Sequence, residues 1–188
     1  IKQINTIRPK LVLAYTQSAY ELARFSLEQS LPIEGVGAVM TSAGTLFPFM
    51  REVISKAFHA PVFNHYGSRE VGGIATECEA HLGLHVHMET QLVEIIDDQG
   101  RPCKPGEEGE IVVTNLINYA MPLIRYRIGD RGIWSDQQCT CGRGARLLKA
   151  VTGRVTDYFI TQEHRIVPSE YFIHLLGVVL NSGWVKKT

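Results

Sequence analysis

The apolar residues in the first third of the chain follow two alternating patterns. Short apolar runs at residues 10–15, 36–40 and 61–64 are typical of buried strands, whereas residues 18–28 and 47–58 carry apolar side chains at helical spacing. The resulting order is strand, helix, strand, helix, strand. Because parallel strands need a long connection between them, this order predicts a parallel sheet with crossover helices.

The pattern changes further along the chain, where helical spacing gives way to strict alternation. Residues 84–96 alternate between apolar and polar side chains, which predicts one strand with a single buried face. Turn-forming residues at 97–100 and 104–110 are typical of hairpins. We therefore expect an α/β protein in which a parallel strand–helix–strand unit is followed by an antiparallel sheet or partial barrel. The second part would span residues 84–160, and a short helix is predicted at 168–176.

Composition narrows the class of protein. The 188 residues include 19 Lys and Arg and 19 Asp and Glu, so the formal net charge is zero, whereas a nucleic-acid-binding protein would usually show a basic excess. The apolar run at residues 175–180 is far shorter than the roughly 18 residues that a membrane helix needs. We expect no nucleic-acid or membrane partner. Cys103 lies in a polar turn and is expected to be an exposed, reduced thiol in a cytoplasmic protein.

The other three cysteines have a spacing that fits a metal site. Cys139 and Cys141 are separated by one residue, a poor spacing for a mutual disulfide and a common one for metal ligands. Cys78 with either His81 or His85 would complete the four-ligand tetrahedron that zinc prefers. Because four protein ligands leave no open coordination position, the predicted role of the zinc is structural.

The segment "NHYGSREVGG", residues 64–73, carries the first set of polar side chains with a chemical meaning. It is predicted to lie where a parallel strand ends, which is where ligands bind in open α/β sheets. The aromatic face suits a base, and the glycine allows the backbone to approach a ligand closely. The segment also carries a hydroxyl, a cation that suits a phosphate, and a carboxylate that suits a magnesium ion. The alternative is a polar turn with a surface ion pair. The residues concerned are Tyr66, Gly67, Ser68, Arg69 and Glu70.

Two further segments carry candidate residues. In "MPLIRYRIGDRG", residues 121–132, alternation predicts a strand that ends at Gly129 and Asp130. A carboxylate at such a strand end can accept hydrogen bonds from both hydroxyls of a ribose, although an aspartate before a turn also commonly caps the turn. In "GRVTDYF", residues 153–159, a glycine, an arginine and an aspartate lead into another alternating strand.

Together and in this order, the three segments resemble the core motifs of the adenylate-forming superfamily of acyl-CoA synthetases, peptide-synthetase adenylation domains and luciferases. "YGSRE" is similar to its Tyr-Gly-x-Thr-Glu element, "YRIGD" to Tyr-Arg-Thr-Gly-Asp, and "GRVTD" to Gly-Arg-x-x-Asp. The segments "ATEC", "GLH", "AMPLIRYR" and "CTCGR" resemble the phenylacetate–CoA ligases and related capsular polysaccharide biosynthesis proteins. The resemblance covers roughly residues 36–170.

The resemblance implies a role for each matching residue. Tyr66 would stack on adenine, Asp130 would bind the ribose, and Asp157 would lie at the hinge. The catalytic pair would be Glu70, which holds magnesium, and Arg154, which approaches the ribose or phosphates. Where the family has a phosphate-binding threonine this chain has Arg69, so Arg69 or Ser68 would take that role, and Gly67 completes the nucleotide site. The acyl pocket would include Ser42, Ala43, Gly44, Gly72, Gly73 and Ile74, and the histidine of the metal site would be His85, with Cys78, Cys139 and Cys141.

The resemblance also implies an activity. Residues 1–157 would be the carboxy-terminal part of the large adenylation domain, and residues 158–188 the hinge and the start of a truncated small domain. The whole enzyme would be an AMP-forming acyl-CoA ligase that uses ATP, Mg²⁺ and coenzyme A, with a structural Zn²⁺. No segment matches the phosphate loop of the family, so we expect the chain alone to be inactive. A non-catalytic nucleotide-binding module and a structural zinc-bearing interaction domain are the alternatives.

Overall fold

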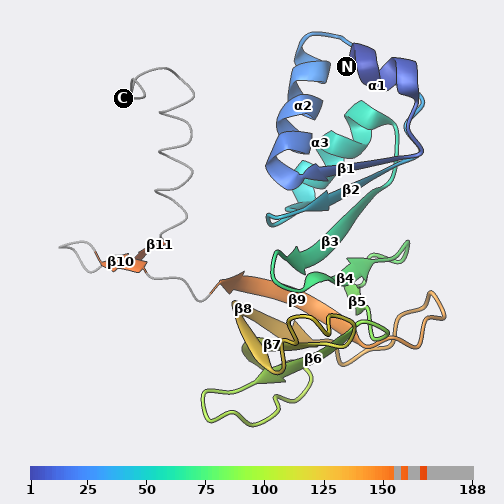
Figure 1. Cartoon of the computed structure of the whole chain (residues 1–188). Coiled ribbons are helices and arrows are strands. Elements are labelled where there is room, and N and C mark those ends of the chain that lie inside the picture. Colours follow the sequence, from blue (N-terminus) through green and yellow to red (C-terminus); the bar gives the residue numbers. More distant parts are fainter. Residues whose placement is uncertain (155–157, 161–165, 169–188) are drawn as a thin grey trace. The chain divides into compact units, whose positions relative to one another are not determined.

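The computed structural model describes residues 1–154, 158–160 and 166–168, which fall into two compact units (Figure 1). The first unit is Ile1–Thr152 and the second is Gly153–Thr188. Within the second unit, β10 (Tyr158–Ile160) pairs with β11 (Ile166–Pro168) as an antiparallel hairpin. The predicted helix at 168–176 lies outside the described residues apart from Pro168, and so does Asp157.

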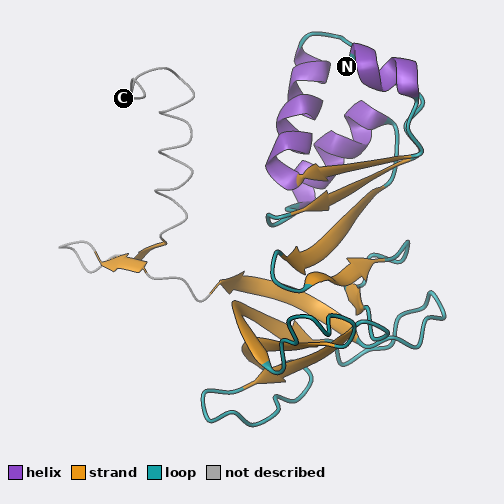
Figure 2. Cartoon of the chain, in the orientation of Figure 1, coloured by secondary structure: helices purple, strands orange, loops and turns teal. Residues whose placement is uncertain are grey.

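The first part of the larger unit is the predicted parallel sheet with crossover helices. Strands β1 (Leu11–Tyr15), β2 (Ala38–Ser42) and β3 (Val62–Ser68) pair in parallel, in that order. The connections are α2 (Thr16–Glu28) and α3 (Pro48–Phe58), and a short unpredicted helix, α1 (Lys2–Ile7), precedes them (Figure 2). The sequence therefore predicted every element of this part except α1.

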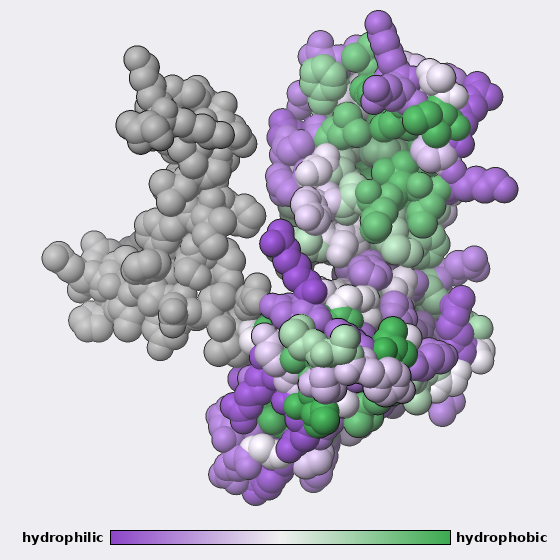
Figure 3. Space-filling view, in the orientation of Figure 1, coloured by the Kyte–Doolittle hydropathy of each residue, from purple (hydrophilic) through white to green (hydrophobic). Residues whose placement is uncertain are grey.

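Apolar side chains from both crossover helices and the three parallel strands form one core. Ala23 of α2 and Ile54 and Phe58 of α3 pack with Val39 and Val62 of the sheet, and all five are buried. The alternate residues of β1 point away from this core and remain at the surface (Leu11, Leu13 and Tyr15). Figure 3 accordingly shows apolar side chains gathered at the surface over the part of the chain that holds the helices and β1.

The second part of the larger unit is an antiparallel sheet that continues directly from β3. The order is β3, β4, β5, β9, β8, β7, β6, so the sheet has nine strands in all. A second core fills this part, built around Ile74, Ile95, Ile111 and the fully buried Trp134. The strands are β4 (Gly72–Glu77), β5 (Leu84–Val86), β6 (Gln91–Ile96), β7 (Glu108–Asn115), β8 (Tyr126–Trp134) and β9 (Leu147–Arg154).

The single strand predicted for residues 84–96 is wrong, because the segment is broken into β5 and β6. The backbone carbonyl of His87 accepts hydrogen bonds from the N–H groups of Thr90 and Gln91, which forms a turn between the two strands. All three residues of β5 are buried, because Leu84 and Val86 pack into the second core and His85 lies among the cysteines 78, 139 and 141. Local alternation could not show this, because it carries no record of what packs against each face of a strand.

Three further expectations from the sequence are corrected. The segment at residues 64–73 was expected to lie where a strand ends. It begins inside a strand instead, because β3 runs through Tyr66 to Ser68 and pairs with the unpredicted β4. Asp130 lies inside β8 rather than at its end, because β8 continues to pair with β7 beyond an irregularity near Gly129, whose φ is 78°. Cys103 is buried, with 8% of its surface exposed, since it packs into the second core.

Among the described residues, no helix is long and apolar enough to cross a membrane.

Candidate functional site

The structure brings together Tyr66 and Asp130, which are 64 residues apart in the sequence. The Tyr66 hydroxyl donates a hydrogen bond of 2.8 Å to Oδ2 of Asp130. Tyr66 lies on β3 and packs its half-buried ring against the antiparallel core, while Asp130 reaches it from β8. An aromatic ring and a carboxylate are therefore held side by side, as binding of a base and a ribose would require.

The remaining residues of the segment 64–73 form the end of β3, the turn after it and the start of β4. The N–H of Val71 donates to the hydroxyl of Ser68 (3.3 Å), which closes the turn, and both Arg69 and Glu70 are exposed within it. A side chain at Gly67 would place its Cβ 2.6 Å from the carbonyl oxygen of Gly72. Gly67 is thus required by the hairpin itself, whatever ligand approaches it.

The residues predicted to line an acyl pocket come from two places. Ser42, Ala43 and Gly44 follow one another at the end of β2, where the Thr16 hydroxyl donates to the carbonyl of Gly44 (3.0 Å). The other three begin β4, and the hydroxyl of Ser42 lies 3.2 Å from Nδ1 of His65 on the strand between them. Of the β4 residues, Gly72 is exposed and Gly73 half-buried, whereas the side chain of Ile74 belongs to the fully buried core.

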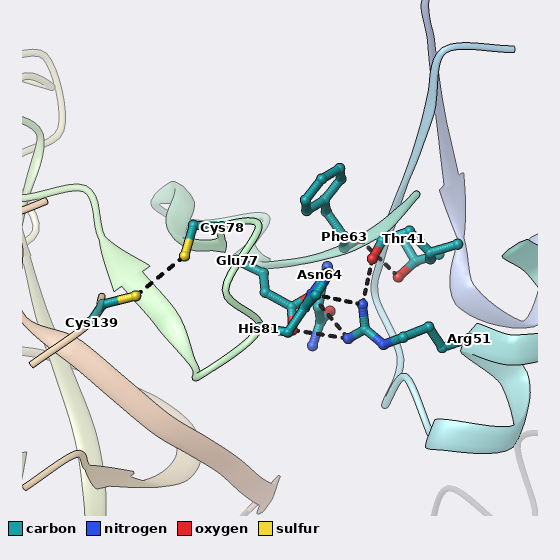
Figure 4. Close-up of polar contacts among 9 residues, drawn as sticks. Thr41, Arg51, Phe63, Asn64, Glu77, Cys78, His81 and Cys139 are labelled. Carbon is teal, nitrogen blue, oxygen red and sulfur yellow. Dashed lines mark hydrogen bonds and ion pairs between the residues drawn. The ribbon is translucent and has the colours of Figure 1, made fainter. Parts of the chain in front are cut away.

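The structure also gathers the four predicted metal ligands. One ligand atom from each of Cys78, His85, Cys139 and Cys141 lies within 4.8 Å of every other. Sγ of Cys78 is 3.4 Å from Sγ of Cys139 (Figure 4), and Sγ of Cys141 is 3.4 Å from Nε2 of His85. Ligands around a tetrahedral zinc with Zn–S bonds of about 2.3 Å lie roughly 3.5–4 Å apart, so the spacing is close to that of such a site.

The surroundings of this cluster also fit a metal ion. The backbone N–H of Arg143 lowers the pKa of the Cys141 thiol to about 6, which favours the thiolate that binds metals. His85 is buried, and its Nε2 lies beside Sγ of Cys141, so Nε2 is the nitrogen placed to bind an ion in the cluster.

The spacing of the residues allowed either His81 or His85 as the fourth ligand of this cluster, and the family resemblance favoured His85. The structure shows which of the two histidines lies at the cluster. Nδ1 of His81 lies 3.3 Å from Oε2 of Glu77, and its ring stacks on Phe63 with the ring centroids 5.5 Å apart. His81 thus belongs to another group of side chains, which the sequence did not reveal.

The residue at the centre of that group is Arg51 on α3. Its Nη2 lies 2.9 Å from both carboxylate oxygens of Glu77, and Oε2 also accepts from the backbone N–H of Asn64 (2.9 Å). Figure 4 shows the Arg51 guanidinium directed at Glu77, with His81 beside them. Because Arg51 also donates to the carbonyl of Val62, it ties α3 to β3 and to the end of β4, next to Cys78. The sequence could not predict this contact, because it depends on how segments far apart in the chain pair with one another.

No protein-family model matches the chain. Among curated proteins, the phenylacetate-coenzyme A ligase of Thermus thermophilus is 32% identical over 133 residues, which cover 69% of this chain and 30% of that enzyme. Protein CapK of Staphylococcus aureus is 29% identical over 171 residues, which cover 89% of this chain and 36% of CapK. The chain thus spans about a third of the length of these curated relatives.

Solved structures share the fold. An open conformation of 2-hydroxyisobutyryl-CoA ligase, in complex with 2-HIB-AMP and CoA, matches with a TM-score of 0.76 at 22% identity, over 94% of this chain and 43% of that one. The amide bond synthetase McbA from Marinactinospora thermotolerans matches with a TM-score of 0.61 at 20% identity, over 93% and 37%. These matches confirm the predicted fold, a parallel unit followed by an antiparallel sheet as in adenylate-forming enzymes.

Proposed function

Because the chain is similar in sequence to phenylacetate-coenzyme A ligases and CapK, and shares the fold of adenylate-forming acyl-CoA ligases, we propose that it contributes the nucleotide-facing part of an ATP-dependent acid–thiol ligase. Such an enzyme activates a carboxylate as acyl-AMP and transfers the acyl group to a thiol, here coenzyme A. The observation that carries the proposal is the hydrogen bond between Tyr66 and Asp130, which places an aromatic ring beside a carboxylate.

In this proposal Tyr66 and Asp130 bind the nucleoside. The ring of Tyr66 stacks on adenine, and the carboxylate of Asp130 accepts hydrogen bonds from the ribose hydroxyls. The Tyr66 hydroxyl donates to Oδ2 of Asp130, which fixes the orientation of the carboxylate. The neighbouring turn then carries the residues that face the phosphates.

The proposed first step joins the acid to AMP. An oxygen of the acid carboxylate attacks the α-phosphorus of ATP, and the bond from that phosphorus to the bridging oxygen breaks, so pyrophosphate leaves. Negative charge on the phosphoryl oxygens would be stabilised by Arg69, in the exposed turn after β3, or by the hydroxyl of Ser68, the last residue of β3. Glu70 would hold the Mg²⁺ that neutralises the phosphates. The side chain of Arg154, the other residue of the predicted catalytic pair, lies outside the described residues.

In the proposed second step the sulfur of the thiol attacks the acyl carbon, the carbon–oxygen bond to the phosphate breaks, and AMP leaves. The protein contributes chiefly by holding the reactants in position. The acid would lie against the segments 42–44 and 72–74, which leave room because most of their side chains are small.

We also propose that Cys78, His85, Cys139 and Cys141 hold a structural zinc ion. The donor set, two thiolates one residue apart with a third thiolate and an imidazole, is one that zinc prefers. Four protein ligands complete its coordination, so the ion would stabilise the fold and would take no part in the ligase reaction. It would tie the end of β4 and the strand β5 to the loop between β8 and β9.

Calorimetric titration of the chain with two ligands tests the ligase proposal. The ligands are AMP and a non-hydrolysable acyl-AMP mimic, in which phenylacetate is joined to adenosine through an N-acyl sulfamate. A site that binds both the nucleotide and the acid should bind the mimic at least about tenfold more tightly than AMP, a difference of 1.4 kcal/mol. Equal affinities would favour a nucleotide-binding module without ligase chemistry, and no affinity for either ligand would overturn the nucleotide site.

A further inference from the structure

The proposed mechanism does not use the buried Gln91, whose side chain contacts the backbone of the hairpin formed by β3 and β4. Gln91 is the first residue of β6, and only 3% of its surface is exposed. Its Nε2 donates hydrogen bonds to the backbone carbonyl of Val71 (2.7 Å) and to that of Gly73 (3.3 Å). A side chain on an edge strand of the sheet therefore holds a hairpin about 20 residues earlier in the chain.

A second amide reaches the carbonyl of Val71 from the neighbouring strand. Asn115, the last residue of β7, is the cross-strand partner of Gln91, and its Nδ2 donates to this carbonyl (3.2 Å). Oδ1 of Asn115 accepts from the N–H groups of Ile117 (3.0 Å) and Asn118 (2.8 Å), which fixes the amide with its donor group toward Val71. Amides from two adjacent strands thus converge on one oxygen.

The carbonyl of Val71 needs donors from outside the hairpin. Val71 lies in the turn between the strands, and its side chain is buried in the second core, with 5% of its surface exposed. The hydrogen bond from Gln91 to this carbonyl is itself buried, and a buried carbonyl without a donor is unfavourable. The two amides therefore fix the position of the turn relative to the antiparallel sheet.

The turn that they hold carries the residues proposed to face the phosphates. The N–H of Val71 donates to the hydroxyl of Ser68 (3.3 Å), so Val71 is held through its carbonyl on one side and its N–H on the other. Arg69 and Glu70 lie between these two residues and are exposed. Groups that bind a phosphate must be held to within about 0.5 Å of their working positions, which exposed side chains on a free turn cannot achieve.

We propose that Gln91, supported by Asn115, is a positioning residue of the ligase site, which holds the turn at residues 68–71 in the shape that binds the phosphate of the nucleotide. The inference rests on the proposed function, because it takes this turn as the phosphate-facing part of the site. In that proposal the nucleoside is bound by Tyr66 and Asp130, which lie on strands rather than in the turn. Loss of Gln91 should therefore affect the phosphate and the nucleoside differently.

The test compares adenosine with AMP, because the two ligands differ only in the phosphate. In calorimetric titration, the unaltered chain should bind AMP at least about tenfold more tightly than adenosine, since the phosphate accepts charge-assisted hydrogen bonds. Gln91→Met keeps the length of the side chain and removes the donor. This variant should bring the ratio of the two affinities close to one and leave the affinity for adenosine unchanged within about twofold.

The outcomes separate this inference from the proposed function. Equal affinities of the unaltered chain for adenosine and AMP would overturn the positioning role but leave the nucleoside site, and with it the proposed function, in place. A lack of affinity for both ligands would overturn the proposed function itself. A ratio that Gln91→Met leaves unchanged would refute the role of Gln91.

A matched variant distinguishes positioning from general stability. Val93→Ala removes methyl groups from the second core on the same strand, so it lowers the melting temperature but leaves both amides in place. It should keep the ratio of the unaltered chain. If Val93→Ala lowers the ratio as much as Gln91→Met does at a similar melting temperature, Gln91 has only a structural role.

A second variant and a measurement without ligand complete the test. Asn115→Asp keeps the oxygen that accepts from the N–H groups of residues 117 and 118 and loses only the donor to Val71, so it should lower the ratio as well, and it decides the question if Gln91→Met does not fold. In amide hydrogen exchange followed by NMR, the N–H of Val71 should exchange faster in both variants than in the unaltered chain, while the N–H of Val112 in the middle of β7 keeps its rate. Unchanged exchange at Val71 in both variants would contradict the proposal.

Discussion

Asp130 contacts Tyr66 across two strands, and the nucleotide assignment depends on this carboxylate. We expect Asp130→Ala to weaken binding of the acyl-AMP mimic by on the order of a hundredfold or more, because two charge-assisted hydrogen bonds to the ribose, each worth roughly 1.5–3 kcal/mol, would be lost. Calorimetric titration measures the affinity and thermal unfolding measures the stability of the same sample. The competing interpretation, that Asp130 only stabilises the fold, predicts a lower melting temperature and an unchanged affinity.

Tyr66→Phe is the matched control for this prediction. It also removes the 2.8 Å hydrogen bond but keeps the aromatic ring and the carboxylate. We expect it to lower the free energy of unfolding by about 1 kcal/mol and to change the affinity far less than Asp130→Ala does. If the two variants lose affinity equally, the carboxylate has no role of its own in binding.

The helix α3 is joined to the hairpin of β3 and β4 by one ion pair, Arg51 with Glu77. The Glu77 carboxylate is 7% exposed and receives three hydrogen bonds, so removing the guanidinium leaves a nearly buried charge without its main partner. Arg51→Met should therefore lower the free energy of unfolding by about 2–3 kcal/mol, as measured by urea denaturation.

A surface arginine provides the comparison. Arg24 on α2 also pairs with two glutamates, but its side chain is 45% exposed, so Arg24→Met should cost less than about 1 kcal/mol. Combining Arg51→Met with Glu77→Gln should cost less than the sum of the single changes, because the buried charge is then gone. Strict additivity, or equal losses at Arg51 and Arg24, would show that the ion pair contributes little.

At the scale of the whole molecule, the cysteine cluster joins segments that lie far apart in the sequence, since Cys78 and Cys139 are separated by 61 residues. We predict one zinc ion per chain after gel filtration, measured by metal analysis. Because metal-binding energy stabilises the fold, chelation should lower the melting temperature by at least about 5 °C.

Two cysteine variants test whether zinc binding depends on the cluster or on any cysteine of the chain. Cys139→Ser should abolish stoichiometric zinc, whereas Cys103→Ala, at a buried cysteine outside the cluster, should keep one ion per chain. A zinc content near zero in the unaltered chain, with four freely titrating thiols, is incompatible with a structural metal site.

The sequence by itself determined the local elements and the family to which the chain is similar. Apolar periodicity located α2, α3 and the three parallel strands to within a few residues, because it depends only on neighbouring side chains. The motif around Tyr66 and the pair Cys139 and Cys141 were equally visible, since their residues are adjacent in the chain. The roles of the individual nucleotide-site residues stay predictions.

The tertiary structure decided which distant residues meet. It placed Asp130 inside β8 beside Tyr66, His85 rather than His81 beside the cysteines, and Arg51 against Glu77. It also broke the predicted strand at 84–96 into β5 and β6. The physical reason is common to all of these: strand order, register and irregularities are set by pairing between segments far apart in the chain, and local periodicity carries no record of that pairing.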